Sequence, residues 1–268
     1  MSPVRVAAVE YLNARPLVEG LGGRTDLFDL RFDVPARCAQ HLHDRAADLA
    51  LIPSIEYLQD PDYRIVPDLA VASEGEVASV ALFTTRPVTS VRSIAVDSSS
   101  RTAAMLLRIL CAESWEIEPK LVKLRPDLPV MLKRCDAAMI IGDAALFLEH
   151  EEKGLEKVDL GEEWTVLTSL PFVWAAWVGR RDALTAEHGR ALAVARAEGE
   201  QAVDDIAARH CPDDDEQREI ARRYLRENVS FGLDERAQSG LRKFYEYAYE
   251  QRLIQLQRDL RFYEWPAE

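Results

Sequence analysis

The residues of this 268-residue chain that are best suited to chemistry are polar side chains placed directly after apolar runs. Asn13 follows the apolar run Val4–Val9, and a serine-rich stretch with Arg101 and Thr102 follows the run Ser93–Val96. In α/β sheets, ligands are held in the loops at the carboxyl ends of the strands. The spacing therefore predicts a binding site that is built from strand-to-helix loops.

The serine-rich stretch consists of Ser98, Ser99 and Ser100, followed by Arg101 and by a helix that apolar periodicity predicts from about Thr102. A helix start attracts anions through its free N–H groups and its dipole, and hydroxyl and guanidinium groups add donors. One serine would suffice for ordinary capping. We therefore favour a carboxylate or phosphate site here over capping alone.

Asn13 has two interpretations. Asparagine is a favoured N-cap, because its side-chain oxygen accepts a free backbone N–H. Pro16 is best placed at the first helical position, however, and it keeps the preceding residue out of the α region. This predicts Arg15 as the N-cap and leaves Asn13 in the loop before the helix, where it is free to bind a ligand. Capping and ligand binding both stay open on this stretch.

Two stretches, Asp48–Leu58 and Asp136–Leu148, resemble each other: each has an Asp, an apolar strand, a small or turn residue and an apolar helix. They predict two similarly built lobes whose turns face each other across a cleft. Ser54 in the first turn either caps it or binds the ligand. Gly142 in the second lets backbone approach a ligand. Asp143 is expected to cap its helix unless the two lobes meet there.

The elements that must position these residues alternate between strand and helix patterns, which is typical of parallel sheets in α/β proteins. The expected strands are Val4–Val9, Phe28–Phe32, Asp48–Pro53, Ile65–Ala72, Val80–Thr84, Ser93–Val96, Leu121–Leu124 and Ala137–Ile141. The expected helices include Ala36–Arg45, Thr102–Glu113 and Leu128–Arg134, and, after residue 181, Asp182–His210, Asp213–Glu227 and Asp234–Gln257.

Two extended passages, Ser79–Val88 and Leu170–Arg181, read as strands that cross from one lobe to the other. They divide the chain into residues 1–84 with 178–268 as the first lobe and 85–177 as the second. Ser79 opens the first crossing, where it lies either near the cleft or on an exposed strand edge. Two lobes that close on a ligand by hinging are the arrangement of solute-binding proteins.

The net charge of −13 argues against nucleic acid or an anionic membrane as a partner, because both attract cationic surfaces. An anionic ligand must then be met by local dipoles and a few placed cations. The N-terminus lacks the basic and apolar regions of a signal peptide, and no apolar run is long enough to span a membrane. The cysteines, Cys38, Cys111, Cys135 and Cys211, form no CxxC pair, so we expect buried thiols in a cytoplasmic protein.

Conventional catalytic motifs are missing from the sequence, including GxSxG, the P-loop, GxGxxG and HExxH. The histidines form no metal signature, and we expect all of them in helices away from the candidate loops: His41, His43, His150, His188 and His210. The residues alone thus predict a small-anion cleft with no metal, and a homodimer is allowed.

Taken in order, several motifs resemble the chorismate dehydratase family of the futalosine route to menaquinone. They are VEYLNARPL, DLALIPSIEYL, VASVALF, VDSSSRTAAMLL, AAMIIGDAAL and VDLGEEWTVLTSLPFVWAAW. The resemblance implies a type II periplasmic-binding-protein fold, with two mainly parallel sheets flanked by helices. It also implies an enzyme that removes water from chorismate without a cofactor and gives 3-[(1-carboxyvinyl)oxy]benzoate. The related dihydroxynaphthoate synthase family shares the fold but opens with a different motif.

The resemblance also implies roles for residues. Asn13 and Ser79 would be the polar residues nearest to the reacting part of the substrate. The cradle for the ring and carboxylates would comprise Tyr11, Ser54, Ile55, Ser98, Ser99, Ser100, Arg101, Thr102, Gly142 and Asp143. It ends at Thr102, because Ala103 stands where many relatives carry a small hydroxyl residue.

The proton acceptor stays open between a substrate carboxylate held by Asn13 and a protein carboxylate, Asp143 or Glu56. A non-catalytic solute-binding protein and the sister synthase are the alternative functions.

Overall fold

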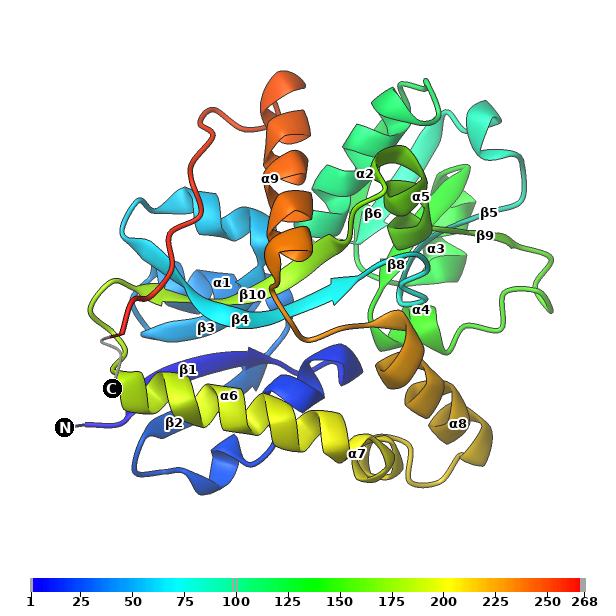
Figure 1. Ribbon diagram of the computed structural model, residues 1–268. Coiled ribbons are helices and arrows are strands. Elements are labelled where there is room, and N and C mark those ends of the chain that lie inside the picture. The colour runs from blue at the N-terminus through cyan, green and yellow to red at the C-terminus, as the bar shows by residue number, and fades with distance from the viewer. Residues whose placement is uncertain (1, 98, 100, 266–268) are drawn as a thin grey trace.

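The computed structural model describes residues 2–97, 99 and 101–265. Within them, Figure 1 shows two lobes side by side, each built on a five-stranded sheet that is flanked by helices. The first sheet has the order β2-β1-β3-β10-β4 and consists of β1 (Val4–Val9), β2 (Phe28–Asp33), β3 (Leu49–Pro53), β4 (Tyr63–Ser73) and β10 (Phe172–Arg180). The second has the order β7-β6-β8-β5-β9 and consists of β5 (Val80–Thr84), β6 (Ser93–Asp97), β7 (Lys120–Leu124), β8 (Ala137–Ile141) and β9 (Glu156–Asp159).

The sheets are mixed rather than mainly parallel. In the first sheet β1 pairs with β2 and β3 in parallel, whereas β10 pairs with β3 and β4 in antiparallel fashion. In the second, β6 is parallel to β7 and β8, and β5 is antiparallel to β8 and β9. The reason is topological. Strands β5 and β10 each enter their lobe from the side of the cleft. They must therefore run opposite to the strands that end at the cleft.

The strand β5 lies wholly in the second sheet and β10 wholly in the first. The crossings therefore fall in the segments that join strands, residues 74–79 after β4 and residues 160–171 after β9. The division at residues 84 and 178 stays a proposal; sheet membership would place the boundaries before residues 80 and 172.

The helices of the first two-thirds of the chain connect these strands and cover the sheets. They are η1 (Leu12–Leu17), η2 (Leu21–Gly23), α1 (Pro35–His43), η3 (Ser54–Gln59), η4 (Val88–Ser90), α2 (Thr102–Glu113), α3 (Leu128–Arg134), α4 (Asp143–Leu146) and α5 (Leu160–Thr168). The C-terminal third forms α6 (Ala186–Gln201), α7 (Val203–His210), α8 (Asp215–Arg223), the π-helix η5 (Tyr224–Asn228) and α9 (Glu235–Glu250). None of the helices in the described part is long and apolar enough to cross a membrane.

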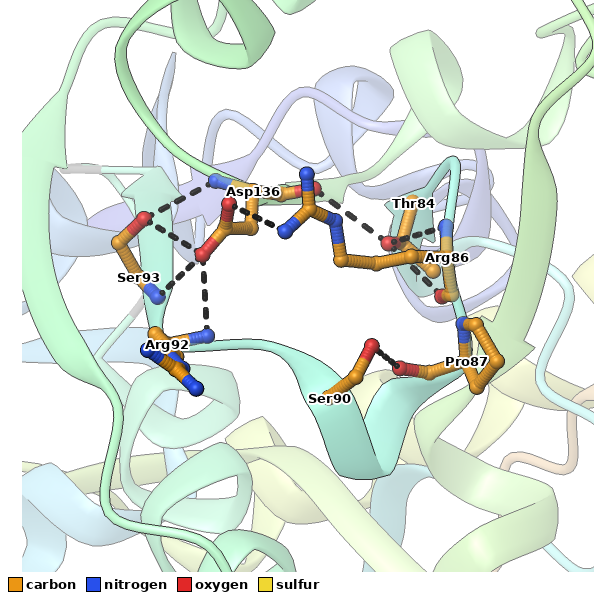
Figure 2. Close-up of polar contacts among 7 residues, drawn as sticks. All are labelled: Thr84, Arg86, Pro87, Ser90, Arg92, Ser93 and Asp136. Atoms are coloured by element: carbon orange, nitrogen blue, oxygen red, sulfur yellow. Dashed lines mark hydrogen bonds and ion pairs between the residues drawn. The ribbon is translucent and has the colours of Figure 1, made fainter.

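Strands β3 and β8, which belong to the two similar stretches of sequence, are each held at their start by a carboxylate. Asp48, just before β3, accepts the Arg5 N–H at 3.2 Å and the Arg5 guanidinium at 2.7 Å. Asp136, just before β8, accepts the N–H groups of Arg92 and Ser93, both at 3.0 Å, and pairs with a guanidinium as well (Figure 2). Each carboxylate therefore fixes the amino end of a strand whose carboxyl end reaches the cleft.

The pKa values of both carboxyls are lowered by these partners. For Asp48 the main cause is the hydrogen bond from the Arg5 side chain, and for Asp136 it is the Arg92 backbone N–H. Hydrogen bonds to the charged form favour it over the protonated form. The two strand starts therefore depend on ionised carboxylates.

Candidate functional site

A small cavity of about 60 Å³ lies between the lobes. Its polar lining comes from Tyr11, Asn13, Arg101 and Thr102, and Gly142 contributes backbone. The remaining walls are mainly apolar and come from both sheets: Val9, Leu51, Val71, Val80, Ile141 and Trp174 among others. The cavity thus combines a few polar groups with a surface suited to a hydrocarbon ring, which is the usual composition of a small-molecule site.

The volume shows that the lobes are close together. Ligand pockets typically span about 300–1,000 Å³. A ring-bearing dicarboxylate cannot enter a cavity of about 60 Å³ unless the walls move. The lobes must therefore part before a ligand of that size enters.

Asn13 lies inside the 3-10 helix η1, whose N-cap is Tyr11. The prediction of Arg15 as N-cap and Pro16 at the first helical position is therefore wrong, because η1 runs through Pro16. The helix starts early because its free N–H at Leu12 is bonded at 3.1 Å by a carboxylate of the other lobe, Asp143. Asn13 is not the N-cap of this helix, and its half-buried side chain lines the cavity.

Behind Asn13, a buried hydroxyl pair connects the lobes to the C-terminal region. The Ser79 hydroxyl lies 2.7 Å from that of Tyr224, and the Asn13 side chain also hydrogen-bonds Tyr224. Burial strongly raises the pKa of Tyr224, and the two hydrogen bonds oppose that rise only in part. Ser79 is 1 % exposed, which excludes the exposed strand edge that the sequence allowed. Tyr224 is thus a neutral hydroxyl held between Ser79 and Asn13.

Asp143 bridges the lobes. Its Oδ1 accepts the Leu12 N–H, and its Oδ2 lies 2.9 Å from Nε2 of His210 at the end of α7. The N-cap of α4 is Gly142, so Asp143 is not the cap that the sequence favoured. The expectation that every histidine lies away from the candidate loops is also wrong, because chain folding brings His210 to this turn. Both carboxylate oxygens of Asp143 have partners.

Gly142 has a φ of 68° and a ψ of −151°, a conformation that an L side chain rarely adopts. A Cβ atom there would lie 2.9 Å from the Tyr11 ring. The Gly142 N–H donates to the Ser79 carbonyl at 2.8 Å. Glycine is therefore required where the Tyr11 ring packs on this turn and forms one wall of the cavity.

Ser54, Ile55 and Thr102 meet across the cleft. The Thr102 hydroxyl lies 3.4 Å from that of Ser54 and accepts the Ile55 N–H at 3.3 Å. As predicted, α2 begins at Thr102, and its N-cap Arg101 makes no side-chain cap hydrogen bond. The Ser54 carbonyl accepts the hydroxyl of buried Tyr245 at 2.6 Å. The start of α2 and the Ile55 N–H therefore converge where an anionic ligand can be held.

Of the three serines in the predicted anion site, the structure describes Ser99. The Ser99 backbone N–H and hydroxyl both donate to Asp97, at 2.8 Å and 2.7 Å. The Ser99 side chain also hydrogen-bonds Tyr11, whose pKa is raised chiefly by burial. Ser99 therefore supports the Tyr11 ring rather than capping α2. Ser98 and Ser100 lie outside the described residues.

Glu56 is buried, 3 % exposed, and contacts two basic side chains, of which only Arg101 belongs to the other lobe. Arg101 Nη1 donates to Glu56 Oε2 at 2.7 Å, and His43 Nε2 lies 2.8 Å from the same oxygen. His43 in turn contacts the Tyr63 hydroxyl at 2.7 Å. His43 is therefore a second histidine that contacts a candidate loop, contrary to the sequence prediction. Glu56 itself does not line the small cavity.

The described residues hold no cluster of three or more His, Cys, Asp or Glu side chains arranged for a metal ion. Cys38, Cys111, Cys135 and Cys211 are free and buried. Burial raises the pKa of Cys38 and of Cys111 to about 12. The thiols of Cys38 and Cys111 therefore remain protonated and pack as small apolar side chains.

Sequence reasoning missed four residues of the site: Trp174, Tyr224, Tyr245 and His210. Trp174 lies in the extended passage Leu170–Arg181, whose sequence pattern predicts only a strand. The other three belong to the C-terminal helices, whose patterns indicate packing alone. Their role depends on long-range contacts between residues far apart in the chain, which local patterns do not encode.

Comparison with solved structures identifies the architecture as the periplasmic-binding-protein fold. A protein of Archaeoglobus fulgidus matches with a TM-score of 0.78 at 21% identity, covering 94% of this chain and 99% of that one. The periplasmic aliphatic sulphonate binding protein SsuA of Escherichia coli matches with a TM-score of 0.70 at 13% identity, covering 98% and 92%. The two-lobed fold class expected from the sequence is therefore confirmed.

The sequence comparisons are more specific. Residues 4–250 match the family described as "Menaquinone biosynthesis", and the chain belongs to that family. A chorismate dehydratase of Thermus thermophilus is 31% identical over 198 residues, which cover 68% of this chain and 72% of that protein. The family resemblance inferred from the motifs is confirmed at this level.

Proposed function

We propose that the protein is a chorismate dehydratase, a hydro-lyase that converts chorismate to 3-[(1-carboxyvinyl)oxy]benzoate and water. The family membership and the Thermus relative support this assignment. The observation that carries it here is the cavity itself, where an amide and the start of α2 face apolar walls. Such a site suits a ring with attached carboxylates.

In the proposed reaction, the C–H bond at the ether-bearing ring carbon breaks, and its electron pair enters the ring. The C–O bond to the neighbouring hydroxyl breaks, and that oxygen leaves as water with the proton. Because the ring becomes aromatic, the protein mainly has to orient the substrate and stabilise developing charge. No electrons are exchanged with a partner, so the reaction needs no redox cofactor.

Binding of the dianion rests on groups that already converge. The start of α2 offers its N–H groups and dipole to one carboxylate. We expect that carboxylate to replace the Thr102 hydroxyl as the acceptor of the Ile55 N–H, which now spans 3.3 Å. These local donors offset a net charge of −13, which would otherwise repel the substrate.

We assign the proton acceptor to the substrate's own carboxylate, oriented by the Asn13 amide. The protein alternatives are less suitable, because Asp143 has both oxygens bonded and Glu56 is paired with Arg101 and His43. Tyr224 and Ser79 act as positioning residues behind Asn13. Ser79 itself does not line the cavity.

We place the reaction in the cytoplasm, because four free, buried thiols suit a reducing compartment. Incubation with chorismate, followed by absorbance and mass, tests the function. An aromatic product lighter than chorismate by one water supports the proposal. Unchanged chorismate contradicts it, and favours either a non-catalytic small-anion binding protein or the sister synthase.

A further inference from the structure

A second and much larger cavity, of about 790 Å³, lies beside the small one. One wall comes from α2 and β7 of the second lobe. The other comes from η3 of the first lobe and from residues 253–258 of the tail that follows α9. The two cavities share Arg101 as their common wall residue. The volume of the larger cavity falls within the range of small-molecule sites, about 300–1,000 Å³.

Three further cations converge on this cavity from three separate segments: Arg108 of α2, Lys123 of β7 and Arg258 of the tail. In a chain with 46 acidic and 33 basic residues, neighbouring carboxylates would be expected to pair with them. Within the described part of the chain, none of the three side chains has a hydrogen bond or ion pair. Their charge is therefore available to a ligand.

Arg258 gives the most specific observation. Its Nη1 atom is buried and has no hydrogen-bond partner among the described residues. A buried guanidinium nitrogen without a partner is costly, and such groups are normally satisfied. The tail is also held in place, because the Tyr57 hydroxyl donates to the Asp259 carbonyl at 2.9 Å and accepts the Arg261 N–H at 2.9 Å. Arg258 is therefore fixed at the cavity and lacks an acceptor.

The two acidic residues of the lining do not neutralise these cations. Glu56 is paired with Arg101 and His43. Asp97 accepts both donors of Ser99. The rest of the lining is largely apolar, with Met105, Leu253 and Ile254 among its larger members.

We propose that this cavity is a second binding site, for a small organic dianion with an apolar body, such as an aromatic dicarboxylate. Guanidinium groups from two segments hold the carboxylates, and the apolar side chains cover the ring. Because its walls come from both lobes, the bound dianion stabilises the arrangement in which the lobes are close together. The site goes beyond the proposed function and does not depend on it.

The test uses isophthalate (benzene-1,3-dicarboxylate) as the probe and isothermal titration calorimetry on the full chain. We expect binding at low salt that weakens at high salt. Replacing two of the cations, as Arg108→Gln with Arg258→Gln, should weaken it at least ~10-fold, the scale of one or two charge-assisted hydrogen bonds. The matched control, Lys133→Gln with Arg134→Gln on the exposed face of α3, removes the same charge elsewhere and should leave affinity unchanged.

Repeating the titration in Asn13→Ala separates this site from the small cavity. Unchanged isophthalate affinity in Asn13→Ala, together with the loss in the Arg108 and Arg258 variant, supports the second site. Affinity that survives the double arginine change, or that Asn13→Ala abolishes, overturns it. Because no turnover is measured, a failure of the dehydratase assignment would leave this result intact.

Discussion

The hydroxyls of Ser79 and Tyr224 lie 2.7 Å apart, and Asn13 hydrogen-bonds the same tyrosine. The three residues come from the segment between the lobes, from a π-helix and from η1. π-helical turns are rare and occur frequently at functional sites. Here the turn η5 begins at Tyr224 and carries its ring into a fully buried position. The C-terminal region thereby helps to fix the orientation of the cleft amide.

Tyr224→Phe removes that hydroxyl and leaves Ser79 and Asn13 without their partner. We expect kcat to fall about 10-fold or more, because a positioned polar group is lost, while KM changes little. The free energy of unfolding should fall by about 1–3 kcal/mol, the usual cost of an unsatisfied buried polar group. Chorismate kinetics and thermal unfolding measure both effects.

The matched control is Tyr263→Phe. The buried Tyr263 hydroxyl donates to the Arg180 carbonyl, away from the small cavity. This variant should lose similar stability at unchanged kcat. An equal loss of kcat in both variants would show that Tyr224 matters only for folding.

Asn13→Ala should keep the fold and lower turnover at least ~10²-fold, as expected for the loss of a positioned polar group. Because Tyr11 is the N-cap of η1, no cap is removed. Thermal unfolding and steady-state kinetics check the two expectations. Near-normal turnover with a lowered melting temperature would show that Asn13 contributes to stability rather than to the reaction.

Asp143→Asn distinguishes the two proton acceptors. If the substrate's carboxylate takes the proton, turnover should fall less than ~10-fold, because the asparagine carbonyl can still accept the Leu12 N–H. A general base contributes about 10²–10⁴-fold. A loss in that range, with a changed pH–rate profile, would instead assign the base role to Asp143.

Asp136→Asn tests how the second lobe depends on pH. The folded-state pKa of Asp136 is lowered, so its stabilising effect is present above the unfolded value of about 3.9 and is lost as the pH falls through the folded value. The variant should melt below the wild type at pH 7, and the gap should close below about pH 4. Asp213→Asn, at an exposed loop carboxylate, is the control; a gap that stays constant with pH would contradict the assignment.

Much of the fold could be predicted because strong local patterns dominate it. Val4–Val9, Val80–Thr84 and Ala137–Ile141 are strands with the expected bounds, and Thr102–Glu113 is a helix as expected. The long helix predicted over Asp182–His210 is divided into α6 and α7. The short β9 and the helix α5 were not predicted, and the antiparallel insertion of β5 and β10 depends on how the two lobes are connected.

The site could be predicted only where its residues lie on strand-end loops. Tyr11, Asn13, Arg101, Thr102 and Gly142 were expected, and they line one cavity. Tyr224 and His210 follow from the docking of C-terminal helices, which no spacing in the sequence encodes. Long-range packing also explains why η1 begins at Leu12, earlier than the sequence predicted. The Leu12 N–H donates to Asp143 of the other lobe.

The most direct measurement is a single-turnover reaction with the purified protein in excess over chorismate, quenched and analysed by mass. The account predicts complete conversion to 3-[(1-carboxyvinyl)oxy]benzoate, with the Asn13→Ala protein at least ~10²-fold slower under the same conditions. Recovery of intact chorismate from the wild-type protein, even where it is bound, would contradict the central claim.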